Sequence, residues 1–307
     1  MDSVRSSFAP VGHERVIAIC ERMLLEDDAL PFIAYYDRGF PAFTISKVSI
    51  DERNPWEKAF RRFVSETIRL DAPLRPLGTG KLIRTVIEFE DGAACCLPIF
   101  AEEYLVGGTR DAVRIDEMDI SLRRLATQAR VKVYLQPDQL PGGYHEVDPG
   151  QPRLSDPVHI ARGPVAERGL QTPLTELAAK MLSATDLQYL AVHRDGDPIF
   201  SADVYESSAL SPWIGGHLAP EGARQQYLDL AAVIRVSLPE ITHSLRTFTD
   251  RSLRRLVLDV EAGAIYVYLL PRHRVLIIGV TVAQPAVYTA EVRLREVVRR
   301  VDELLQG

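Results

Sequence analysis

The sequence is poor in cysteine and tryptophan, and it has neither a long apolar run nor an excess of positive charge. Its cysteines, Cys20, Cys95 and Cys96, are too few for a paired disulfide framework, so we interpret them as small apolar side chains. No apolar run approaches the length of a membrane-spanning helix, and the first residues lack the apolar core of a secretory signal. A net charge of −6 argues against a nucleic-acid partner, because such a partner requires a basic surface. These absences predict a cytoplasmic protein that does not insert into membranes.

Catalytic and cofactor motifs are also missing. Residues 77–84, LGTGKLIR, contain Gly80-Lys81, which is half of a phosphate-binding loop. A complete loop needs a glycine five positions before this pair and a hydroxyl directly after it, whereas Arg75 and Leu82 occupy those positions. We therefore interpret the stretch as a turn that leaves a helix and enters a strand. We find no catalytic, metal-binding or cofactor-binding constellation, and we expect the protein not to be an enzyme.

Two stretches of the chain resemble each other. The run IAYYDRGFPAF, residues 33–43, aligns without gaps with LAVHRDGDPIF, residues 190–200, at a spacing of 157 residues. Each run has two apolar segments around a charged turn with glycine, which predicts a β-hairpin. The two tryptophans, Trp56 and Trp213, each follow a proline and keep the spacing of 157. Several matches in the same order indicate an internal duplication.

A second block repeats at a larger spacing. Residues 86–109 match the block that begins at Val257, with Gly92 aligned to Gly263 and Gly108 to Gly279, at a spacing of 171 residues. The second copy therefore carries extra residues, and the glycine- and proline-containing loop after its Pro-Trp pair is where they fit.

A segment without periodicity separates the copies. Residues 136–171 are rich in proline and glycine, as expected of an extended linker. A chain of 307 residues is long enough for two domains. We predict a first domain at residues 13–135 and a second at residues 172–307.

Hydrophobic periodicity predicts the element order α-β-β-α-β-β-β-α in both copies. In the first copy, Asn54-Pro55-Trp56 has the composition of a helix start. Antiparallel strands with an inserted helix predict an α/β (α+β) fold class, each domain having a five-stranded antiparallel sheet with helices on both faces. The expected elements are a helix at 14–26, a hairpin at 32–46, a helix from 54, strands within 82–109 and a helix at 116–130, then a helix at 173–184, a hairpin at 189–202, a helix at 225–238, strands within 255–282 and a helix at 289–305.

This element order resembles the roadblock / dynein light chain family, which is close to the longin and profilin-like folds. The second copy carries the closer match. Its turn with Asp195, Gly196 and Pro198 looks like the family's hairpin turn, and the run VRLR at residues 292–295 is similar to the last helix of the family's bacterial branch. The first copy has Arg38 in place of the aspartate, and its last helix lacks the VRLR run.

The resemblance implies a non-enzymatic binding platform. Roadblock proteins join the third strands of two sheets edge to edge, with their second helices packed together. Many of them bind Ras-like small GTPases, and the gliding-motility branch stimulates GTP hydrolysis. Two copies in one chain then suggest an intramolecular pseudo-dimer, because open edge strands tend to pair, and the same edges make self-association possible. The alternative is a secretion-chaperone-like or scaffold protein that holds a client without nucleotide dependence.

Side chains of the second helices and of one basic turn are the candidates for an interface. Aromatic anchors concentrate binding energy, and the turn Arg272-His-Arg274 is the counterpart of the acidic turn Ala101-Glu-Glu103. Core packing of the tryptophans and solvation of both turns are the alternatives. The predicted partner or inter-domain interface residues are Trp56, Phe60, Phe63, Trp213, Leu230, Ile234, Arg272 and Arg274.

Overall fold

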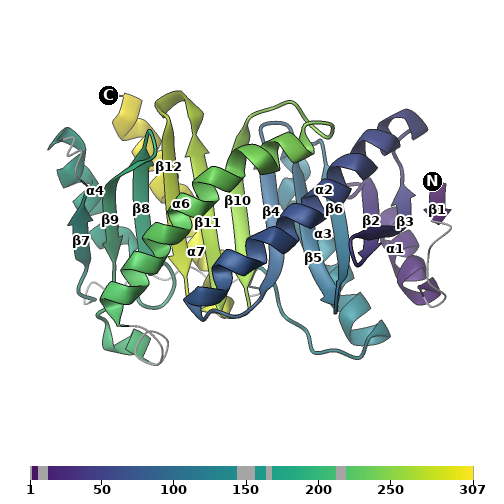
Figure 1. Ribbon diagram of the computed structural model, residues 1–307, viewed down its shortest axis with the longest axis horizontal. Coiled ribbons are helices and arrows are strands. Elements are labelled where there is room, and N and C mark those ends of the chain that lie inside the picture. The colour runs from purple at the N-terminus through teal and green to yellow at the C-terminus, as the bar shows by residue number, and fades with distance from the viewer. Residues whose placement is uncertain (1, 6–12, 144–155, 164–167, 212–218, 307) are drawn as a thin grey trace. The chain divides into compact units, whose positions relative to one another are not determined.

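The computed structural model describes residues 2–5, 13–143, 156–163, 168–211 and 219–306, and it divides into two compact units (Figure 1). Unit 1 contains Met1–Ala72, Leu82–Leu140 and Ser237–Arg254. Unit 2 contains Pro73–Lys81, Pro141–Val236 and Arg255–Gly307. Each unit combines α-helices with an antiparallel sheet, as the sequence predicts.

The sheet of unit 1 has the strand order β1-β3-β2-β6-β5-β4. The predicted five strands are present, and the short N-terminal strand β1 adds a sixth by pairing with β3. The elements are β1 (Asp2–Arg5), α1 (Glu14–Glu26), β2 (Phe32–Asp37), β3 (Phe40–Ser46), α2 (Ile50–Leu74), β4 (Leu82–Phe89), β5 (Ala93–Phe100), β6 (Glu103–Thr109) and α3 (Ile115–Gln128), which continues as a π-helical turn, Ala129–Val133.

The sheet of unit 2 repeats this arrangement in the order β10-β11-β12-β8-β9-β7. Its sixth strand, β7, comes from the segment that the sequence predicts to be an extended linker, and it pairs with β9. The prediction of five strands is therefore wrong for both units. The elements are β7 (His159–Arg162), α4 (Arg168–Met181), β8 (Tyr189–Arg194), β9 (Asp197–Asp203), α6 (Pro220–Leu245), β10 (Leu253–Val260), β11 (Gly263–Leu270), β12 (Val275–Thr281) and α7 (Val287–Gln306).

Helices cover both faces of each sheet. In unit 1, α2 crosses one face, and α1 and α3 pack together on the other (Figure 1). In unit 2, α6 crosses one face, and α4 and α7 pack together on the other (Figure 1). A helix facing a sheet buries one apolar stripe, and α2 does so with Phe60, Phe63 and Val64, which are fully buried.

Irregularities of the backbone recur at equivalent places in the two units. The β2–β3 pairing slips between Tyr35 and Tyr36, and the β8–β9 pairing slips between Val192 and His193, 157 residues later. A bulge inserts one unpaired residue and twists the strand, so a matching position is a specific feature. The structure thus supports the duplication inferred from the sequence.

One pair of glycines in that alignment needs correction. Gly107, not Gly108, is the counterpart of Gly279. A side chain on Gly107 would meet Leu122 at 2.8 Å, and one on Gly279 would meet Leu294 at 2.5 Å. Both glycines therefore let the last helix of their unit pack directly against the sheet.

The second helix of the first copy starts earlier than predicted. It begins at Ile50, because Ser49 and Glu52 have the spacing of a capping box and the Ser49 hydroxyl donates a hydrogen bond to the Glu52 carboxylate at 3.2 Å. The Asn54-Pro55 pair lies one turn inside the helix. Helix α6 is likewise longer than its predicted counterpart, and it continues through Pro239.

The two compact units do not follow the two sequence copies strictly. The last part of α6 and the loop after it, Ser237–Arg254, belong to unit 1, although they come from the second copy. The end of the first copy's second helix and the turn after it, Pro73–Lys81, belong to unit 2. Each copy thus contributes one segment to the core built mainly by the other.

Candidate partner-binding surfaces

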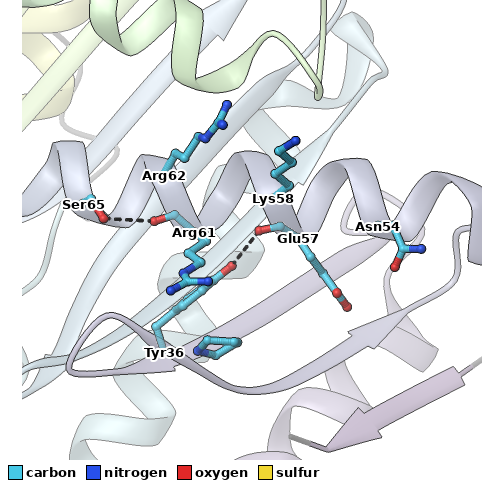
Figure 2. Close-up of a pocket in the computed structure, with 8 residues that line it drawn as sticks. Tyr36, Asn54, Glu57, Lys58, Arg61, Arg62 and Ser65 are labelled. Carbon is cyan, nitrogen blue, oxygen red and sulfur yellow. Dashed lines mark hydrogen bonds between the residues drawn. The ribbon is translucent and has the colours of Figure 1, made fainter.

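A basic hollow lies on unit 1, between α2 and the β2–β3 hairpin (Figure 2). Its volume is about 510 Å³. Tyr36 and Pro41 of the hairpin form one side. The helix lines the rest with Asn54, Glu57, Lys58, Arg61, Arg62 and Ser65.

Tyr36 is a buried and hydrogen-bonded part of the lining of this hollow. Only 1% of the residue is exposed, and its hydroxyl donates a hydrogen bond to the backbone carbonyl of Glu57 at 3.3 Å. Burial, with a smaller contribution from the Glu57 charge, raises the pKa of Tyr36 well above its usual range. The phenol therefore stays neutral and serves as a rigid support rather than as an acid or base.

The predicted interface residues of the first copy are buried in unit 1. Trp56 is 2% exposed, and Phe60 and Phe63 are fully buried. Trp56 packs edge-on against Phe248, with ring centroids 4.9 Å apart, and Phe60 lies 5.3 Å from Phe248. Their role at a partner or inter-domain interface remains a prediction, and what the structure shows is a core position.

Phe248 comes from the segment that the second copy contributes to unit 1. Arg110 covers the cluster, with its guanidinium 5.2 Å from the Trp56 ring and 5.5 Å from the Phe248 ring. Arg110 also donates a hydrogen bond to the Phe248 carbonyl at 2.6 Å, and Thr249 donates one to Asp91 at 2.7 Å. These polar contacts hold the segment in the core of unit 1.

The predicted residues of the second copy divide into buried and exposed groups. Leu230 is 4% exposed and Ile234 is fully buried, so both belong to the core stripe of α6. Trp213 lies outside the described residues. Arg272 is exposed, and Arg274 forms an ion pair with Asp195 at 2.6 Å.

The two turns of opposite charge make contacts within their own units. Arg274 binds Asp195 across the adjacent hairpin turn of unit 2. In unit 1, Glu103 accepts a hydrogen bond from the Tyr35 hydroxyl at 2.5 Å and lies 3.7 Å from the His13 imidazole. A role for these turns in orienting a partner remains a prediction.

The glycine-lysine stretch connects a helix to a strand, as predicted. Gly78 ends a short 3-10 helix in the left-handed conformation, and β4 begins at Leu82. The backbone N–H of Lys81 donates to the carboxylate of Glu261 at 3.1 Å. A protein carboxylate thus occupies the position that a phosphate would need, and a side chain on Gly80 would come within 2.5 Å of it.

A buried ion cluster in unit 1 joins its sheet to its last helix. Arg84 of β4 donates to Asp119 of α3 with an Nη1–Oδ2 distance of 2.5 Å, and the Arg84 side chain is 3% exposed. The Nε atom of Arg123, one turn further along α3, lies 3.5 Å from the same carboxylate. Two cations therefore compensate one largely buried carboxylate.

Unit 2 contains the counterpart of this cluster. Arg255 of β10 pairs with Glu291 of α7, and Arg295 binds the same carboxylate at 3.1 Å. The Arg255 side chain is 6% exposed. A charged triad around a largely buried carboxylate thus recurs in both units, so it is a shared structural feature and does not distinguish one surface from the other.

The sequence contains a pattern of acidic and arginine residues that corresponds to these clusters and that is not among the predicted site residues. The run ISLR, residues 120–123, occupies the same place in α3 as VRLR in α7. In each run the last arginine, Arg123 or Arg295, lies four residues after an acidic residue, which is the spacing of a helical ion pair. An arginine near the start of the third strand, Arg84 or Arg255, completes the pattern.

The cysteines are buried side chains without activated thiols. Cys20, Cys95 and Cys96 are fully buried. Burial raises the pKa of all three, that of Cys96 to about 12. Because the thiolate is the reactive form, these thiols are inert at neutral pH.

Within the described ranges, no group of histidine, cysteine, aspartate or glutamate side chains is placed to hold a metal ion. No helix in the same ranges is both long and apolar enough to cross a membrane. Comparison of the chain with protein-family models, with curated proteins and with solved structures found no match.

Proposed function

We propose that the chain is a non-enzymatic platform that binds a Ras-like small GTPase, with its two roadblock-like copies acting together as an intramolecular pseudo-dimer. The observation that supports this most is the position of the third strand of each copy. Among the described residues of unit 1, β4 pairs with β5 alone, and among those of unit 2, β10 pairs with β11 alone. The third strand of each copy therefore ends the strand order within its own unit, and roadblock domains associate through the strand at that position.

The difference between the copies supports binding of a single, oriented partner. A dimer of identical domains offers two identical faces. In this chain, by contrast, the second helix of one copy carries Lys58, Arg61 and Arg62 on its outer face, and the second helix of the other copy is more apolar. We infer that a partner binds the outer faces of these two helices, because the buried aromatic and charged side chains of both units stabilise the fold. The finer fold assignment, two roadblock/longin/profilin-like domains, belongs to the same proposal.

Affinity capture tests the proposal. The immobilised full chain is incubated with native lysate in the presence of GDP or of a non-hydrolysable GTP analogue, and retained proteins are identified by mass spectrometry. The proposal predicts a small GTPase enriched in one nucleotide state only. Retention of an unrelated client in both states would favour the alternative, a chaperone-like or scaffold protein.

Light scattering after size-exclusion chromatography tests the pseudo-dimer separately. If the two copies associate with each other within one chain, the chain should elute as a monomer of 34.3 kDa. An obligate dimer at all concentrations would contradict the intramolecular arrangement without excluding GTPase binding.

A further inference from the structure

The outer face of α2 carries three cations at the rim of the basic hollow. Lys58, Arg61 and Arg62 are all exposed. In the described part of the chain, none of the three forms an ion pair with a carboxylate, whereas Arg38, Arg69 and Arg110 of the same unit do. With Glu57 as the only acidic residue of the lining, three cations and one carboxylate give the hollow a net charge of +2.

The fold does not require this charge. The buried stripes of α2 and α6 match at a spacing of 171 residues, since Ala59 and Phe63 correspond to Leu230 and Ile234. In that register the outward positions of Arg61, Arg62 and Ser65 are occupied in the second copy by Ala232, Val233 and Val236.

Those counterparts form an exposed apolar face. Val233 is 42% exposed and Val236 is 68% exposed. The same helix in the same fold is therefore built without cations at these positions. Clustered, unpaired cations raise local repulsion, so their presence in one copy points to a ligand of opposite charge rather than to stability.

The geometry of the hollow favours carboxylates on an extended surface. Arg61 reaches from α2 toward Tyr36, whereas Lys58 and Arg62 leave the helix in the other direction (Figure 2). The cations thus spread across the helix face, so they fit several separate anionic groups better than one compact anion. Guanidinium groups match the planar geometry of a carboxylate with two parallel hydrogen bonds.

We propose that the basic hollow docks an acidic segment of a partner protein, with at least two carboxylates opposite Lys58, Arg61 and Arg62. The proposal does not depend on the identity of the partner as a GTPase, and its test uses no nucleotide.

The first step of the test is selection from an unbiased random peptide library displayed on phage, with the full chain as bait. The proposal predicts selected peptides that share closely spaced acidic residues. A selected peptide is then synthesised with a fluorescent label, and its affinity is measured by fluorescence anisotropy at low and high salt. Exposed ion pairs are screened by salt, so affinity should fall as salt rises.

The second step maps the site with variants of matched charge. The double variant R61E/R62E should weaken binding by about tenfold or more, because attraction is replaced by repulsion at two contacts. The control R15E/R22E changes the net charge equally, on exposed arginines of α1, and should leave affinity unchanged. Circular dichroism of both variants checks that each is folded.

Each alternative result has a clear meaning. Selected peptides without acidic residues, or equal weakening by both double variants, would overturn the proposal. Competition by inorganic phosphate, or binding of the chain to phosphatidylserine vesicles that is lost in R61E/R62E, with no acidic peptide selected, would assign the hollow to a phosphate group or a membrane instead and would also overturn it.

Discussion

Truncation of Phe248 to alanine tests whether the second copy completes the core of unit 1. The ring is fully buried and contacts Trp56 and Phe60 with centroid distances of 4.9 Å and 5.3 Å. Removal of a buried phenylalanine side chain lowers the free energy of unfolding by about 3 to 5 kcal/mol. Aromatic pairs add about 0.5 to 1.5 kcal/mol beyond burial, so two of them place Phe248→Ala toward the upper part of that range.

The assay is urea unfolding monitored by the fluorescence of Trp56, in a Trp213→Phe background that leaves a single tryptophan. Loss of the adjacent ring should also let water approach Trp56 and shift its emission to the red before unfolding begins. Phe40→Ala is the matched control, since the same substitution at a residue that is 65% exposed should change stability by less than about 1 kcal/mol. If Phe248→Ala cost no more than Phe40→Ala and left the emission of Trp56 unchanged, the segment Ser237–Arg254 would not belong to the core of unit 1.

Three further predictions concern charge and titration. Asp119→Asn removes the charge that compensates buried Arg84, so it should lower the free energy of unfolding by about 3 kcal/mol in urea titrations, whereas Glu296→Gln on an exposed helix face should have little effect. Burial, aided by the charge of Arg235, lowers the pKa of His193 from 6.5 to about 4. Between those values the unfolded chain binds a proton that the folded chain does not, so stability should fall as the pH drops through this window, by roughly 3 kcal/mol in total, and His193→Gln should flatten that slope in urea titrations at several pH values. The three cysteines should not react with a thiol reagent in the folded protein at neutral pH and should react fully in denaturant, and rapid labelling of the native chain would contradict their burial.

Local patterns predicted much of the fold. The charged turns with glycine located both hairpins, and helical periodicity placed α1 at its observed bounds, Glu14–Glu26. Errors arose where two local signals competed. The Asn54-Pro55 pair looked like a helix start, but α2 begins one turn earlier, where Ser49 and Glu52 have the spacing of a capping box and their side chains are hydrogen-bonded.

Tertiary contacts explain what the sequence could not predict. The strand β7 has no periodic pattern of its own, and it forms because its backbone pairs with the edge of β9. The contact of Trp56 with Phe248 joins residues that are far apart in the chain, so no local pattern could predict it. The basic hollow depends likewise on the approach of α2 to the hairpin, whereas the cations themselves are visible in the sequence.

Isothermal titration calorimetry with purified Ras-like small GTPases, each loaded with GDP or with a non-hydrolysable GTP analogue, tests the central claim most directly. The proposed function predicts that one GTPase binds a single copy of the chain in one nucleotide state and binds much more weakly in the other. Equal affinity in both states, or no binding by any GTPase while an unrelated client binds, would contradict it.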